Sequence, residues 1–214
     1  MKVSKFIVNP IGENTYILWN GNGTDAAIVD PGMMYDEERK AVDDFIVKNE
    51  LTVKMVLMTH LHFDHAASAR YVADKYNVNV YANLADEHLA SSLPLQAGMF
   101  GINVSIEPLK IDIGIDENSI IELNGEKIKV LSTPGHTGGS VAFYVADSGV
   151  VFVGDTLFCQ SIGRTDLPGG NHRQIIDSIK HKLYVLPDET VVLPGHGDST
   201  TIGDEKCYNP YVRF

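Results

Sequence analysis

The sequence contains three histidines and one aspartate within six residues: His60, His62, Asp64 and His65. They follow an apolar run at residues 54–58, and an apolar run that opens into a polar loop is typical of a buried strand. Side chains two residues apart on an extended chain point the same way, so His60 and His62 can converge on one point. Asp64 and His65 lie past the bend and can face a second point. Imidazole and carboxylate suit zinc, iron or manganese, so the segment predicts a metal site rather than a His-rich surface loop.

Three later segments repeat this arrangement, in which an apolar strand ends beside glycine and a metal-binding side chain. These side chains are His136, Asp155 and His196, which follow residues 130–131, 150–153 and 191–193. Glycine permits the tight turn that aims a side chain into a cleft. Five histidines and two aspartates are more ligands than one tetrahedral zinc ion can bind. They suit two metal ions that share a bridging carboxylate. The other histidines, His88, His172 and His181, have no ligand-like neighbours and are expected in surface or packing roles.

The order of patterns along the chain predicts strands followed by helices, twice. Residues 36–49 and 66–76 have helical spacing, and Asp64 is a candidate N-cap for the second helix. The pair Asn124-Gly125 between alternating segments predicts a hairpin. Residues 91–102 predict a loop or broken helix beside the pocket. Further strands are expected at residues 6–8, 15–19, 26–29, 79–81, 120–123, 127–131, 141–145, 150–153 and 190–193, and further helices at 85–92 and 173–183. Two sheets packed face to face with helices outside satisfy this order.

Composition limits the classes of function. A hydrophobic content of 44% in 214 residues fits a single globular domain over residues 1–214, without a linker or repeat. No segment approaches the roughly 20 apolar residues of a membrane span, and no signal peptide is evident, so a cytoplasmic location without membrane association is expected. The net charge of −11 argues against a nucleic-acid partner. Cys159 and Cys207 are expected to be reduced thiols.

The motif His-x-His-x-Asp-His, together with His136, Asp155 and His196, resembles the metallo-β-lactamase superfamily over nearly the whole chain, from Asp30 to His196. The resemblance implies an α+β fold, the αβ/βα four-layer sandwich, with two divalent metals in a cleft at one edge of the sheets. Zinc is the expected metal, with iron or manganese as alternatives. The implied ligands are His60, His62 and His136 for the first metal, Asp64, His65 and His196 for the second, and Asp155 between them. Asp30 is similar to a carboxylate that orients ligands.

Residues 154–158, 163–166 and 201–205 are most similar to short glyoxalase II-like hydrolases. Full-length glyoxalase II enzymes add a helical C-terminal domain whose basic residues help to bind glutathione. Only a short tail follows His196, so that domain is not expected and the use of glutathione stays open.

Thioester hydrolysis is the reaction that this chemistry favours. Metal-activated hydroxide attacks a carbonyl whose oxyanion the cations stabilise. A thiolate leaves without help because a thiol has a pKa of about 8.5. An amide nitrogen needs a proton donor, for which the candidates are Asp64 and a metal-bound water. A small-molecule thioester such as S-D-lactoylglutathione is the expected substrate. Arg164 is expected either to anchor a substrate carboxylate or to form a structural salt bridge.

The main alternative is a persulfide dioxygenase, in which one iron ion would be held by His60, His136 and Asp155. A phosphodiesterase or nuclease is disfavoured by the acidic charge, and a β-lactamase by the need for a proton donor. A metal-binding module without catalysis is the remaining alternative.

Overall fold

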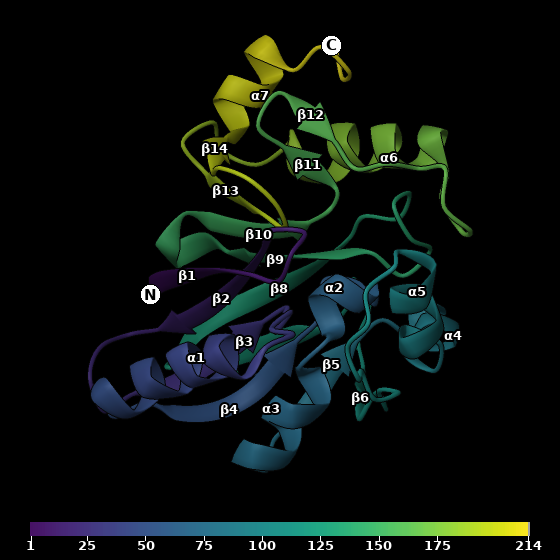
Figure 1. Ribbon diagram of the computed structural model, residues 1–214. Coiled ribbons are helices and arrows are strands. Elements are labelled where there is room, and N and C mark those ends of the chain that lie inside the picture. Colours follow the sequence, from purple (N-terminus) through teal and green to yellow (C-terminus); the bar gives the residue numbers. More distant parts are fainter. Residues whose placement is uncertain (214) are drawn as a thin grey trace.

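Two six-stranded sheets lie face to face at the centre of the molecule, and helices cover the outer face of each (Figure 1). The structure is a computed structural model that describes residues 1–213. The strand order is β1-β2-β3-β4-β5-β6 in the first sheet and β14-β13-β10-β9-β8-β7 in the second. The predicted α+β fold, an αβ/βα four-layer sandwich, is confirmed.

The first half of the chain forms the first sheet and its helices. Its strands are β1 (Lys2–Val8), β2 (Glu13–Trp19), β3 (Asp25–Val29), β4 (Thr52–Leu57), β5 (Asn79–Ala82) and β6 (Ile113–Gly114). Its helices are α1 (Asp36–Lys48), α2 (Phe63–Ala66), α3 (Ala69–Tyr76), α4 (Glu87–Ala90) and α5 (Leu93–Met99), with the 3₁₀ turn η1 (Leu84–Asp86).

The second half forms the second sheet and its helices. Its strands are β7 (Ile120–Leu123), β8 (Glu126–Ser132), β9 (Val141–Val145), β10 (Val150–Gly154), β13 (Val191–Pro194) and β14 (Thr200–Thr201), beside the small hairpin of β11 (Leu157–Phe158) and β12 (Ser161–Ile162). Its helices are α6 (His172–Ser178) and α7 (Ile202–Tyr208), with the 3₁₀ turn η2 (Ala146–Ser148) and the π-helical turn η3 (Ile179–Leu183).

Alternating side chains of the central strands explain the four layers. On β2, Tyr16 and Leu18 face the second sheet, whereas Ile17 packs under the helices of the first half. On β10, Phe152 lies between the sheets, and Val151 packs against the helices of the second half. Because successive residues of a strand point to opposite faces, a strand that is apolar throughout is covered on both sides. Among residues 1–213, no helix is both long and apolar enough to cross a membrane.

The predicted hairpin at Asn124-Gly125 is confirmed. β7 and β8 pair antiparallel on either side of it, and both residues have positive φ values, 52° and 80°. These values match the turn that Asn-Gly favours between two twisted strands.

Cys159 and Cys207 are both free thiols at the surface.

The helix predicted at residues 66–76 is divided in two, and the prediction that Asp64 caps it is wrong. His62 is the N-cap of α2, and Asp64 lies inside its first turn. The chain then breaks at Ser68, whose N–H donates to the carbonyl of Pro31 at 2.8 Å and whose hydroxyl donates to that of Met33 at 2.6 Å. These long-range bonds compete with the helical ones, so α2 and α3 take separate directions.

Asp86, which is fully buried, connects the two halves of the molecule. Its carboxylate accepts hydrogen bonds from the N–H of Leu61 at 3.3 Å, the hydroxyl of Thr137 at 2.7 Å and the N–H of Gly139 at 2.7 Å. Leu61 follows β4 of the first sheet, and Thr137 and Gly139 follow β8 of the second. One side chain thus fixes two loops whose sequences lie far apart.

We therefore predict that Asp86→Ala lowers the free energy of unfolding by roughly 2–4 kcal/mol, because three buried donors lose their acceptor. Asp116→Ala is the matched control, since Asp116 also accepts bonds from Asn118 and Ser119 but is exposed. The control is expected to change stability much less. Urea denaturation of the metal-free variants measures both, and equal losses would contradict the role given to Asp86.

Candidate metal centre

Four strand ends bring the metal-binding side chains together at one edge of the paired sheets. His60 and His62 lie in the loop after β4, and Asp64 and His65 lie on α2. His136 follows β8, Asp155 follows β10 and His196 follows β13. Thus the first sheet supplies four of the seven predicted residues and the second sheet supplies three. Six of the seven form two groups, and Asp155 lies between these groups.

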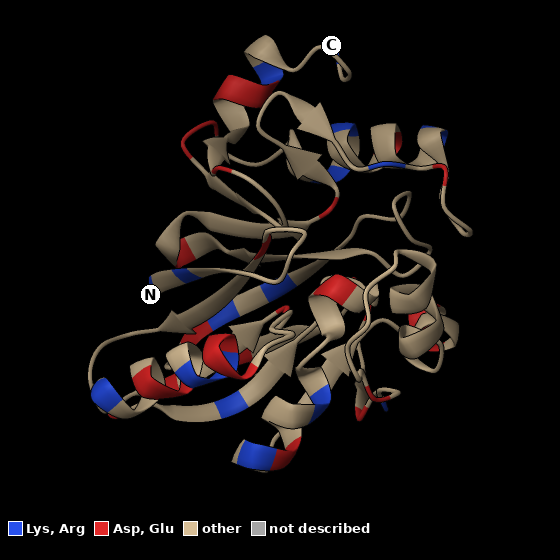
Figure 2. Ribbon diagram, viewed as in Figure 1, with Lys and Arg blue, Asp and Glu red and all other residues tan. Residues whose placement is uncertain are grey.

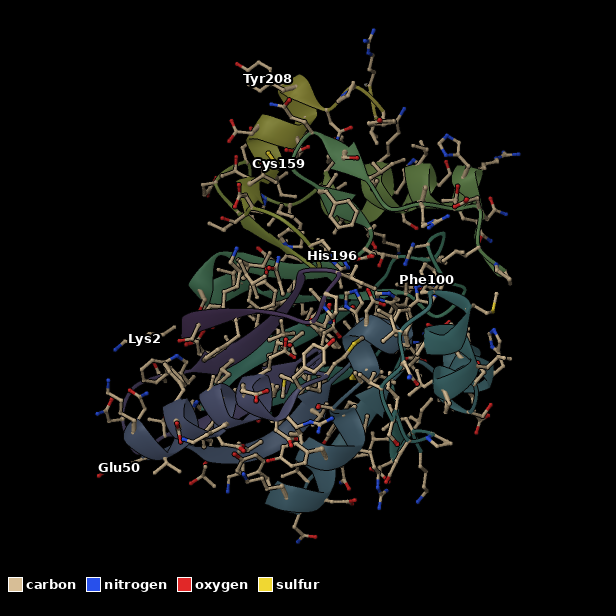
Figure 3. The ribbon with its side chains drawn as sticks, in the orientation of Figure 1. Lys2, Glu50, Phe100, Cys159, His196 and Tyr208 are labelled. Atoms are coloured by element: carbon tan, nitrogen blue, oxygen red, sulfur yellow. The ribbon has the colours of Figure 1, made fainter. Side chains whose placement is uncertain are left out.

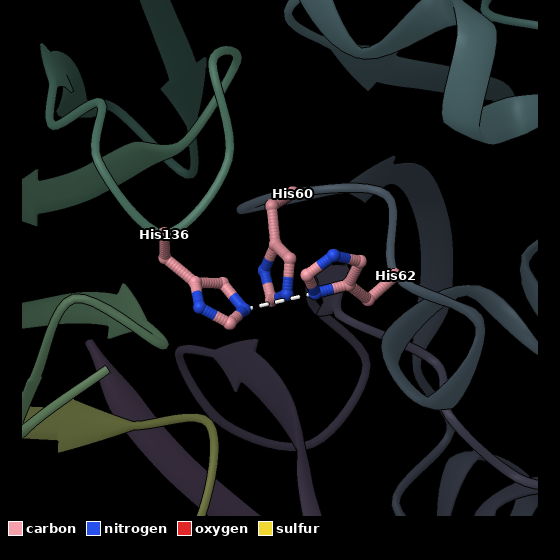
Figure 4. A group of neighbouring side chains, drawn as sticks. All are labelled: His60, His62 and His136. Atoms are coloured by element: carbon pink, nitrogen blue, oxygen red, sulfur yellow. Dashed lines mark hydrogen bonds between the residues drawn. The ribbon is translucent and has the colours of Figure 1, made fainter. Parts of the chain in front are cut away.

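His60, His62 and His136 form the first group (Figure 4). One ring nitrogen from each lies within 4.8 Å of the others, and Nδ1 of His62 is 2.8 Å from Nε2 of His136. Nε2 of His60 is buried without a hydrogen-bond partner. A buried polar atom without a partner is costly, so three converging imidazoles are well suited to a shared cation.

Asp64, His65 and His196 form the second group, which has the same compactness. Oδ2 of Asp64 lies 3.2 Å from Nε2 of His196 and 3.9 Å from Nε2 of His65. Nε2 of His65 is buried and has no hydrogen-bond partner. This group combines two imidazoles with a carboxylate, a donor set that zinc, iron and manganese accept.

Asp155 lies between the two groups. Its Oδ1 is 3.3 Å from Nε2 of His65, in the second group, and its Oδ2 is 3.6 Å from Nε2 of His136, in the first. Oδ2 is also 3.7 Å from Nε2 of His196, and Oδ1 has no hydrogen-bond partner. The Asp155 carboxylate thus lies within 3.7 Å of imidazoles of both groups, as a ligand shared by two metal ions would.

The outer nitrogens of three imidazoles are held by hydrogen bonds. Nδ1 of His65 lies 3.0 Å from Oδ2 of Asp30, and Nδ1 of His60 lies 3.1 Å from the hydroxyl of Thr59, which donates to Asp30 at 2.5 Å. Nδ1 of His136 lies 2.8 Å from the carbonyl oxygen of Arg164. When Nδ1 carries the proton, the lone pair of Nε2 faces the centre. Asp30 is itself near His60 and His65, but its oxygens already accept these bonds, which suits an orienting role.

The electrostatic environment shifts the pKa values of the imidazoles in different directions. Burial lowers the pKa of His60 well below its usual range, and the neighbouring His65 and His136 lower it further. Burial, together with His136, lowers the pKa of His62 to about 4. For Asp155, burial acts to raise the pKa, but His65 and the other imidazoles outweigh it and the pKa falls. For His65 and His196, burial acts to lower the pKa, but Asp155 and Asp64 outweigh it and the pKa of both imidazoles is raised. An ionised Asp155 therefore faces His60 and His62 with lowered pKa values and His65 and His196 with raised ones.

Gly195 allows the loop of His196 to approach the centre. A Cβ atom at this position would lie 2.3 Å from Oδ1 of Asp155 and 2.4 Å from Cε1 of His65. Any side chain would therefore displace two residues of the predicted site. This close approach explains the glycine before His196 in the sequence, for which the turn alone was the expected reason.

Glu13 and Asn14, at the start of β2, are site residues that the sequence patterns did not reveal. Asn14 Nδ2 donates to the carbonyls of Pro194 at 3.0 Å and Gly197 at 2.9 Å, on either side of His196. Burial raises the pKa of Glu13 well above its usual range, and its Oε1 lies 3.8 Å from Nδ1 of His65. Both residues are buried. In the sequence they are polar residues at the start of an apolar strand, and this position is the feature that could have revealed them.

A cleft of about 350 Å³ opens over the centre. Residues of both groups line it, as does α5, so the prediction that residues 91–102 border the pocket is confirmed. His88, which was expected in a surface or packing role, is exposed but forms part of the cleft wall. Arg164 also lines the cleft, and its guanidinium makes two hydrogen bonds with Asp166, at 2.7 and 2.8 Å. A role of Arg164 in substrate binding stays a prediction.

Known proteins match this chain over its length. The family model described as the metallo-beta-lactamase superfamily matches residues 8–196. Hydroxyacylglutathione hydrolase GloC of Haemophilus influenzae is 36% identical, over 99% of this chain and 98% of that protein. The solved structure of BLEG-1 B3 metallo-beta-lactamase has a TM-score of 0.89 and 34% identity, over 99% of each chain. That of TTHA1623 in a di-iron-bound form has a TM-score of 0.85 and 34% identity, over 98% of this chain and 100% of the other. The chain therefore belongs to the metallo-beta-lactamase superfamily of metal-dependent hydrolases.

Proposed function

We propose that this hydrolase cleaves thioesters, with a hydroxyacyl thioester such as S-D-lactoylglutathione as the first substrate to test. His60, His62 and His136 would hold one divalent metal ion, and Asp64, His65 and His196 a second, with Asp155 between them. The observation that carries the proposal is the position of Asp155, whose two oxygens face the two groups at 3.3 and 3.6 Å. The di-iron form of TTHA1623 and the name of GloC support it.

Zinc is the metal we propose, with iron or manganese as alternatives. When bound, two such ions supply a nucleophilic water at neutral pH and polarise the carbonyl of the substrate. The chain's own contribution is to fix the ligands: Asp30 and Thr59 hold His65 and His60, and the carbonyl of Arg164 holds His136. Pre-set ligands reduce the reorganisation that the reaction requires.

The cleft favours a leaving group that needs no proton. Apart from the seven proposed ligands, the titratable residues that line it within residues 1–213 are His88 and Arg164. Arg164 does not release a proton near neutral pH, and Asp64, the acid that the sequence suggested, accepts a hydrogen bond from His196. A thiolate leaves without an acid, whereas an amide nitrogen does not.

A β-lactam is the second candidate substrate, because BLEG-1 B3 metallo-beta-lactamase is 34% identical over the whole chain. Hydrolysis of its amide requires protonation of the nitrogen, for which the described residues of the cleft offer His88 or one of the proposed ligands. We also propose that the partner is a small molecule, with neither nucleic acid nor membrane bound, and that the chain acts in the cytoplasm.

Metal analysis combined with a substrate panel tests the function. We expect two metal ions per chain, hydrolysis of S-D-lactoylglutathione, loss of activity with a chelator and recovery when metal is restored. Turnover of a β-lactam with no thioesterase activity would favour the second candidate. One iron ion per chain, with oxygen uptake on glutathione persulfide, would identify a dioxygenase instead.

His62→Ala is expected to lower kcat/KM at least about 100-fold and to reduce the metal content, because the first group loses one of three imidazoles. His181→Ala is the control, since His181 is exposed and its ring contacts only the backbone carbonyl of Asp177. Elemental analysis and steady-state kinetics measure both variants. Wild-type turnover and metal content in His62→Ala would refute the ligand assignment.

Asp30→Asn is expected to weaken metal binding roughly 10- to 100-fold while the fold is retained. Asn tolerates the positive φ of 47° at this position, but its amide cannot accept every bond that the carboxylate accepts from Thr59 and His65. Competition with a chromogenic chelator measures the affinity, and circular dichroism checks the fold. An unchanged affinity would show that Asp30 does not orient the ligands.

A further inference from the structure

One wall of the cleft is apolar and uncharged. Phe63 on α2 and Leu95, Met99 and Phe100 on and just after α5 line it, and these four residues are called the apolar wall. Phe63 and Phe100 pack with ring centroids 5.3 Å apart. Figure 2 shows α5 without any charged residue, and Figure 3 shows Phe100 to the right of His196 at a similar height; both residues line the cleft.

Three of the four residues of the apolar wall are exposed, and Phe63 is buried beneath them. Leu95 is 68% exposed, Met99 71% and Phe100 47%. Three large apolar side chains within six residues form a contiguous patch, and a patch of this kind at a cleft marks a binding surface. Because these side chains contribute little to the core, their apolar character is best explained by a ligand.

The apolar wall is held in a fixed position beside the proposed metal ligands. Phe63 lies between His62 and Asp64 in the sequence, so it adjoins both groups. Its N–H donates to Oε1 of Gln96 at 3.1 Å, and Nε2 of Gln96 donates to the carbonyl of Leu89 at 3.0 Å. Gln96 thus ties α5 to the loop that carries His62.

The cleft has one cationic side chain, within residues 1–213, that is not a proposed ligand or a histidine. This is Arg164, which lines the cleft with Leu167 and Pro168, pairs with Asp166 and has its carbonyl in contact with His136. A thioester has two ends: the thiol portion of glutathione is charged, whereas an acyl chain is apolar. The charged end fits the side of Arg164, and the acyl chain fits the apolar wall.

We propose that the apolar wall binds the acyl chain of the substrate, so that the preferred substrates are hydroxyacyl thioesters with a longer apolar chain than lactoyl. This inference rests on the proposed thioesterase function and specifies its substrate class. Each methylene group that the apolar wall removes from water raises kcat/KM roughly three- to fourfold. The increase ends when the acyl chain is longer than the apolar wall.

A chain-length series tests the inference. Lactoyl, hydroxybutanoyl and hydroxyhexanoyl thioesters are compared, each on glutathione and on the uncharged thiol N-acetylcysteamine. We expect kcat/KM to rise with acyl length on both thiols. Constant or falling values would overturn the inference and leave the thioesterase function intact, whereas no hydrolysis of any member would overturn the proposed function itself.

Variants of the wall identify the surface responsible. Leu95→Glu is expected to lower the ratio of kcat/KM for hydroxyhexanoyl to that for lactoyl at least tenfold, and Leu95→Met to retain it. Val47→Glu is the matched control, because Val47 on α1 is 76% exposed and lies outside the cleft. Both positions are exposed, so the charge does not enter the core. An unchanged ratio in Leu95→Glu, or an equal fall in Val47→Glu, would contradict the assignment.

Discussion

The structure depends on one constraint: five imidazoles and two carboxylates are gathered at the edge between two sheets, where water is largely excluded. Burying such groups is unfavourable unless they are paired, and several inward-facing atoms have no partner within the protein. The Nδ1 atoms of three of these imidazoles form hydrogen bonds with Asp30, Thr59 and the carbonyl of Arg164, which offset part of this unfavourable free energy. A bound cation would supply the interaction that these inward atoms lack.

Much of the site could be predicted from the sequence because its residues occur in local patterns. His60, His62, Asp64 and His65 are adjacent in the chain, and His136 and His196 each follow an apolar run and a glycine. The strands were predictable for the same reason, since alternation and turn residues act over short distances. The structure places all these side chains where the patterns suggested, within two compact groups.

The features that sequence patterns missed all depend on distant contacts. Asp86 has an ordinary setting in the sequence, and only the fold places it between Leu61 and Gly139. The break at Ser68 results from its bonds to Pro31 and Met33. The expected loop or broken helix at residues 91–102 contains the helix α5. Leu93 and Ala97 of this helix pack in the core, whereas Leu95 and Met99 line the cleft, so its apolar residues do not follow one packing period. Each miss marks a position where tertiary structure overrides local preference.

The hydrogen bond between Asn14 and the carbonyl of Pro194 joins residues 180 positions apart. Contacts of such separation form slowly, because a long loop must close before the contact stabilises anything. During synthesis, the segment 60–65 with four of the proposed ligands leaves the ribosome well before His196. One face of the first sheet stays uncovered until the second sheet has formed. Both groups are therefore incomplete until the second sheet has joined the first, because His136 and His196 belong to it.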